Sequence, residues 1–248
     1  NGYNVAVGHD AGKTVTTGLQ NVFVGALAGD ALTTGTSNIA IGYAAMSTAN
    51  GTESRNVAIG QFALFAMDAD GNNYNVAIGY DAGKEVTTGV NNTILGGLSG
   101  DAVTTGADNT LLGNRSGGAL TTGVRNVAVG MQALGNEDAH GYNVAVGYLA
   151  LHDLNAGVDG YNLAVGTKAG ENITDGINNT IIGSLAGDVL TTGDNNIVIG
   201  KNSAVSANSA SNETVIGTTT TTSALVHGLK QPVIAASANV AAAAAFPN

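Results

Sequence analysis

The stretch YNVAVGHDAGKTVTTGLQNVFVGALAGDALTTG, residues Tyr3–Gly35, states one pattern twice, with a spacing of seventeen residues. Each copy opens with N-h-x-h-G, where h is an apolar residue, and continues as A-G-x-x-h-T-T-G. A unit this short has no room for a capped helix. Repeats of this size are typical of solenoids, in which each unit packs only against its neighbours.

The N-h-x-h-G pattern recurs thirteen times and covers most of the chain. Nine of the twelve steps are 17 residues long, one is 18 and two are 19. The residue four before the glycine is Asn in twelve copies and Glu213 in the other. We predict one β-roll repeat domain over residues 1–217 and a neck, a cap or the start of a further domain over 218–248. The anchor glycines are Gly8, Gly25, Gly42, Gly60, Gly79, Gly96, Gly113, Gly130, Gly147, Gly166, Gly183, Gly200 and Gly217.

The three residues between Asn and Gly are typical of a strand that is buried on both faces. The two outer residues share one face, and the middle residue, which is never polar, lies on the other. Where the first outer residue is Thr, the middle one is bulky, which indicates that the two faces trade apolar volume. The h-T-T-G segment predicts a second short strand that ends in a glycine turn.

These features predict an all-β fold, a parallel β-roll or β-solenoid of about 13 coils spaced about 4.8 Å apart. The Asn column is expected to form an amide ladder from coil to coil. A lone rod of this kind exposes an apolar stripe along its whole length. We therefore expect copies of the chain to associate with closed rotational symmetry, of an order that spacing alone does not give.

The units NVAVG, NIAIG and NVAIG resemble the head repeats of YadA-like trimeric autotransporter adhesins, and the longer unit with AG and LTTG is similar to repeats of phage tail fibres. The resemblance covers residues 4–217. It implies a homotrimer of parallel β-rolls, intertwined or side by side, with this strand near the three-fold axis. The expected trimer interface is then Ala6, Phe23, Ala40, Ala58, Ala77, Ile94, Leu111, Ala128, Ala145, Ala164, Ile181 and Val198.

The 17-residue coil and its TTG turns depart from the adhesin head, and no heptad stalk or membrane anchor is visible. The resemblance therefore favours a structural and adhesive segment of a phage tail fibre, located in the virion tail, that presents a host-receptor-binding tip. Its partners would be a host cell-surface glycan or protein receptor and other tail proteins. The alternative is the head of a bacterial surface adhesin that binds host matrix or cells.

Composition excludes several other functions. The chain has 248 residues, a formal net charge of −10 and only 8 Lys and Arg, which are scattered, so nucleic-acid binding is not expected. Without cysteine there are no disulfides or thiolate metal sites. The chain contains no run of about 18 apolar residues, so membrane insertion is not expected. The start at Asn1, without Met, indicates a fragment or a processed chain.

Four stretches lack the TTG turn and carry most of the unusual side chains. They are Tyr43–Arg55, Gln61–Tyr74, Met131–Tyr142 and Tyr148–Tyr161. Such stretches either carry binding residues or are bulges that pack locally. The candidate receptor contacts are Tyr43, Phe62, Phe65, Tyr80, Tyr148, His152 and Asp153.

Other chemistry finds little support. GHDAGKT has three residues between its glycines where a phosphate loop has four, and DADGNN lacks the distal Glu of a calcium loop. The four histidines show no metal-ligand spacing, and carboxylates such as Asp138 and Asp153 form no recognisable pair for glycan cleavage. Adjacent threonines cannot both face one side, as an ice-binding array requires. We expect a non-enzymatic protein without a cofactor.

Overall fold

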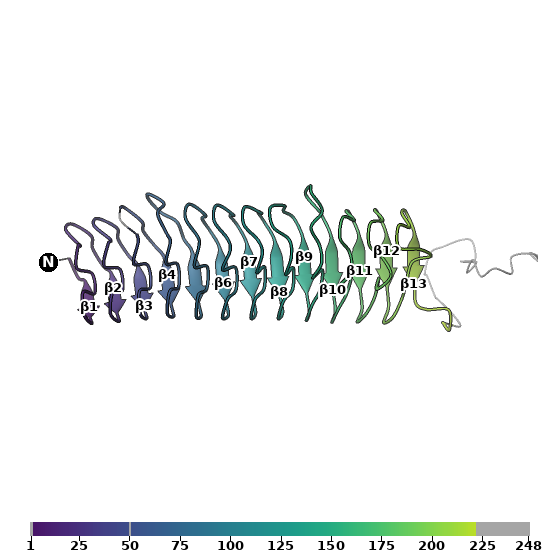
Figure 1. Ribbon diagram of the computed structural model, residues 1–248, viewed down its shortest axis with the longest axis horizontal. Coiled ribbons are helices and arrows are strands. Elements are labelled where there is room, and N and C mark those ends of the chain that lie inside the picture. The colour runs from purple at the N-terminus through teal and green to yellow at the C-terminus, as the bar shows by residue number, and fades with distance from the viewer. Residues whose placement is uncertain (1, 50, 222–248) are drawn as a thin grey trace, which may run out of the picture.

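The computed structural model describes residues 2–49 and 51–221, which form a rod of stacked coils (Figure 1). Thirteen three-residue strands lie side by side in chain order in one parallel sheet, and no helix occurs in these ranges. The predicted all-β parallel solenoid is confirmed, with about twelve turns. The strands are β1 Val5–Val7, β2 Val22–Val24, β3 Ile39–Ile41, β4 Val57–Ile59, β5 Val76–Ile78, β6 Thr93–Leu95, β7 Thr110–Leu112, β8 Val127–Val129, β9 Val144–Val146, β10 Leu163–Val165, β11 Thr180–Ile182, β12 Ile197–Ile199 and β13 Thr214–Ile216.

Each coil is named here by the strand that opens it, so that coil 7 begins with β7. The strands pair in one constant register, centre to centre, from Ala6 opposite Phe23 to Val198 opposite Val215. The two 19-residue steps keep this register, and their loops extend beyond the others beside β4 and β9 (Figure 1). Most of the predicted segment 218–248 lies outside the described residues.

The predicted asparagine ladder is confirmed. Just before β7, the Asn109 backbone N–H donates to Oδ1 of Asn92 at 3.0 Å, and the Asn109 Nδ2 donates to the same oxygen at 3.1 Å. Nδ2 also donates to the Gly123 carbonyl at 2.9 Å, across the coil. The ladder asparagines from Asn21 to Asn196 are buried, so their amides satisfy backbone groups that water does not reach.

The strand centres point into the coil and not toward a neighbouring copy. The flanking residues point outward instead, and some are substantially exposed, as with Leu95 at 45% and Ile197 at 42%. The expected trimer interface is therefore wrong, because a side chain enclosed by its own coil cannot contact another copy. Ala6 is exposed only because it lies in the terminal coil. The enclosed centres are Phe23, Ala40, Ala58, Ala77, Ile94, Leu111, Ala128, Ala145, Ala164, Ile181 and Val198.

The predicted second strand does not form. The apolar residue of h-T-T-G lies in the core as expected, with Leu32 and Leu120 fully buried, but the backbone of the segment is bent and irregular. Single backbone hydrogen bonds still connect successive coils there, as from the Thr87 N–H to the Thr104 carbonyl at 2.9 Å. The sheet is thus confined to one side of the rod, and turns form the other.

In eight of the coils, volume is traded between the strand centre and the fourth residue after the anchor glycine. Where the centre is bulky, as at Phe23, that residue is glycine, and a Cβ on Gly29 would lie 2.3 Å from the Phe23 ring. Where the centre is Ala128, Leu134 fills the space and is fully buried. The inferred trade between the two faces of the strand is wrong, because only one of those faces points into the coil.

Candidate lateral binding groove

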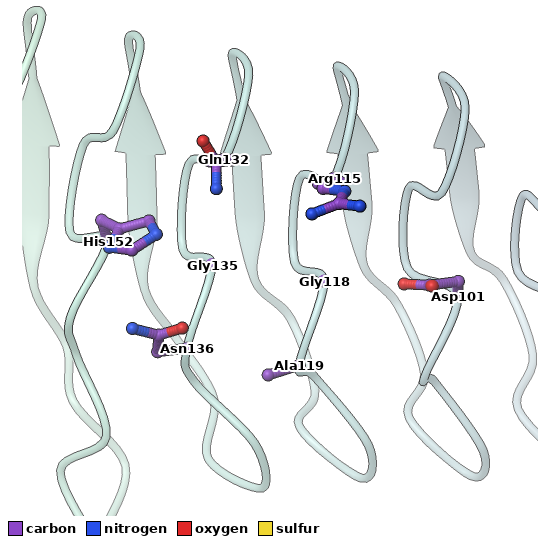
Figure 2. A pocket seen from close by; sticks show the side chains of 8 residues that line it. All are labelled: Asp101, Arg115, Gly118, Ala119, Gln132, Gly135, Asn136 and His152. Atoms are coloured by element: carbon purple, nitrogen blue, oxygen red, sulfur yellow. The ribbon is translucent and has the colours of Figure 1, made fainter.

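A groove of about 250 Å³ crosses coils 6 to 9 on the turn side of the rod (Figure 2). Its floor forms where Gly118 and Gly135 occupy the fifth position after the anchor glycine. The neighbouring coils carry Asp101 and His152 at that position, and these side chains close the two ends of the groove. Two consecutive missing side chains in a regular column therefore create the depression.

Arg115 and Gln132 form one wall of the groove, at the second position after the anchor glycine. Both have left-handed backbone angles, with φ of 55°. Within the described part of the chain, the guanidinium of Arg115 makes no hydrogen bond or ion pair. Its donors are free to bind a carboxylate or phosphate group in the fork geometry that arginine favours.

Asn136 and His152 are fixed through one shared carboxylate. His152 Nδ1 lies 2.7 Å from Oδ1 of Asp153, and Asn136 Nδ2 donates to the same oxygen at 3.2 Å. At the other end, burial raises the pKa of Asp101, and Arg115 acts in the opposite direction. The groove thus offers a cation, an anion and two amides within a short span, an arrangement suited to a hydroxyl-rich, charged ligand.

Three aromatic rings gather in coils 3 and 4, at positions that belong to the same face of the repeat. Tyr43 packs edge-on against Phe62, and Phe62 packs edge-on against Phe65, each with ring centroids 5.4 Å apart. Lys84 Nζ lies 6.0 Å from the centroid of Phe62. Phe62 and Phe65 occupy the second and fifth positions after the anchor glycine, as Arg115 and Asp101 do in the groove.

The candidate receptor contacts thus fall into three sets. Tyr43, Phe62 and Phe65 form the aromatic cluster, His152 and Asp153 lie at one end of the groove, and Tyr80 and Tyr148 are exposed just after their anchor glycines. Sequence reasoning missed the rest of the groove, formed by Asp101, Arg115, Gln132 and Asn136. The signal was available in the aligned repeats, as a column of side chains interrupted by two glycines.

Comparisons of the chain with protein-family models, curated proteins and solved structures find no match. No family is therefore assigned. No helix in the described part of the chain is long and apolar enough to cross a membrane.

Proposed function

We propose that the chain is a structural and adhesive fibre segment, assembled from three copies, that binds host cell-surface glycan through its lateral groove. The observation that carries the proposal is the interruption of a side-chain column by Gly118 and Gly135, beside the unpaired Arg115 guanidinium. Sugar hydroxyls suit the amides and the carboxylate, and an acidic sugar suits the arginine.

The outer face of the sheet supports self-association. It consists of two rows of Val, Ile, Leu and Thr, which point outward from each strand. Twelve steps of about 4.8 Å give a strip roughly 60 Å long. At a width of about 10 Å it covers roughly 600 Å², which approaches the area that one partner buries in a stable complex. A straight, uncharged strip of constant width requires a partner equally long and straight, which a second copy of this chain provides.

The leading assignment for the assembly is a phage tail fibre in the virion tail, where the rod spans distance and presents a receptor-binding end. The alternative is the head of a bacterial surface adhesin. The resemblance of the repeats supports both, and the 17-residue coil with its TTG turn favours the fibre. Immunogold labelling distinguishes them, since antibody against the chain decorates phage tails in the first case and the bacterial surface in the second.

A glycan array with the full chain and its Gly118→Asp variant tests the groove. Aspartate occupies this column at Asp101 and Asp188, so the substitution fills the groove without disturbing the fold. We expect wild-type protein to bind acidic glycans and the variant to bind at least tenfold more weakly. Ala31→Asp, in coil 2, is the control and retains binding. Equal binding by wild type and Gly118→Asp would refute glycan binding in the groove. Release of new reducing ends from bound glycan would refute a purely adhesive role.

A further inference from the structure

Coil 8 places a glutamate where most other coils place an apolar core residue. Glu137 lies seven residues after its anchor glycine, in the column that holds Leu120 in coil 7 and Leu154 in coil 9, and it is fully buried. Oε1 accepts the backbone N–H of His140 at 3.0 Å, but Oε2 is buried without any hydrogen-bond partner. A buried carboxylate oxygen without a donor is strongly unfavourable unless the group is protonated or a cation neutralises it.

Two further ligand groups converge on this carboxylate. Nδ1 of His140 lies 3.3 Å from Oε1 of Glu137, and the carboxylate of the exposed Asp138 is also close. One ligand atom from each of the three residues lies within 4.8 Å of the others. All three residues lie in the stretch of coil 8 that lacks the TTG turn, and their spacing matches no familiar metal motif.

We propose that Glu137, Asp138 and His140 form a binding site for a divalent transition-metal ion, with Zn²⁺ as the best-suited ion. One imidazole nitrogen and two carboxylates form an N/O ligand set that favours Zn²⁺ over Ca²⁺ or Mg²⁺, which prefer oxygen ligands alone.

The geometry needs little adjustment to bind the ion. Tetrahedral ligands at about 2.0–2.2 Å from zinc lie roughly 3.4 Å apart, so ligand atoms that now lie within 4.8 Å of one another need to approach by at most about 1.4 Å. The side chain of Asp138 is exposed and can move by a rotamer change. The ion would neutralise the buried glutamate and fix the irregular turn of coil 8, beside Asn136 in the groove wall.

Isothermal titration calorimetry of the untagged, EDTA-treated full chain with ZnCl₂ tests this site. We expect one Zn²⁺ per chain, with Ca²⁺ and Mg²⁺ binding at least tenfold more weakly. Glu137→Gln and His140→Ala should weaken Zn²⁺ binding at least tenfold. Glu137→Leu should abolish it while the fold is retained by circular dichroism, because leucine is the residue of this column in both neighbouring coils.

Two matched controls separate this site from general effects. Glu53→Gln removes the other fully buried glutamate, which pairs with no histidine among the described residues. His152→Ala removes a histidine that pairs with the exposed Asp153. Both variants should bind Zn²⁺ as wild type does. The proposal is overturned if wild type shows no saturable Zn²⁺ binding, if folded Glu137→Leu binds unchanged, or if His152→Ala removes the binding.

Discussion

Leu111 occupies the space that a side chain at Gly117 would need, since a Cβ built on Gly117 would lie 2.8 Å from Cδ2 of Leu111. Coil 8 fills the same space from the turn, because its strand centre is the small Ala128 and its turn residue is Leu134. The two arrangements fill one interior from opposite sides. The left-handed backbone at this turn position, φ of 57° at Gly117 and 53° at Leu134, accommodates either residue.

Exchange of the two residues of coil 7 should therefore be tolerated better than either single change. Gly117→Leu overpacks the coil and should cost about 1–3 kcal/mol of unfolding free energy. Leu111→Ala opens a cavity and should cost about 2–5 kcal/mol. The double variant Leu111→Ala/Gly117→Leu should recover at least half of the larger loss, measured by urea unfolding. Additive losses in the double-mutant cycle would contradict the volume trade.

Removal of one rung of the asparagine ladder should be costly. Asn109→Ala leaves the Asn126 backbone N–H and the Gly123 carbonyl buried without their partners. Each of the two unsatisfied groups costs about 1–3 kcal/mol, so we expect a loss of about 2–6 kcal/mol in chemical denaturation. Asn114→Ala, at an exposed asparagine shortly after β7, is the control and should change stability by less than about 0.5 kcal/mol.

Glu53 should make stability depend on pH. Burial raises its pKa, backbone hydrogen bonds oppose this, and the charges of Asp68 and Asp70 add to the rise. The folded state therefore holds the proton more tightly, and this contribution to stability is present below the ordinary glutamate pKa, about 4.3, and lost as pH rises through the folded value.

Glu53→Gln should then raise the melting temperature at pH 7, and the gain should shrink as the pH falls through the raised folded pKa and vanish below about 4.3. The uncharged side chain keeps an oxygen to accept the Gly51 N–H, which now bonds Oε2 of Glu53 at 2.9 Å. Glu85→Gln, at an exposed glutamate, should show no such gain. A gain that is constant from pH 4 to pH 7 would refute this origin.

The outer face of the sheet should govern the oligomeric state. Wild-type chain is expected at three times 24.4 kDa by light scattering, and Leu95→Asp should shift it toward 24.4 kDa, because the interface cannot bury an unpaired charge. Val189→Asp makes the same change at an exposed apolar residue away from the strands and should leave the mass unaltered. A wild-type monomer at micromolar concentration would remove the basis of the trimer.

Most of the fold could be predicted from the repeat. A constant spacing of N-h-x-h-G fixed the strands, their parallel order and the buried asparagine column, because each requires only local pattern and stacking. Which strand face points inward was not evident, since Ala at the centre and Val or Ile at the flanks are apolar alike. The partner that decides it, Leu134 or Gly117 in the turn, lies outside the strand pattern.

The groove and the cluster around Glu137 escaped prediction for another reason. The groove residues come from four successive coils, and the cluster around Glu137 lies on a turn that departs from the repeat, so neither matches a familiar motif. Comparison of the coils column by column would have found the two glycines Gly118 and Gly135 and the single charged residue in an apolar column.

The constant register of the sheet has an evolutionary consequence. A coil that pairs centre to centre with each neighbour can be duplicated or deleted in frame, and the coils on either side rejoin in the same alignment. Each such event changes the reach of the molecule by about 4.8 Å and leaves its ends intact. The length of the rod can thus change in uniform increments without a change in how its coils pair.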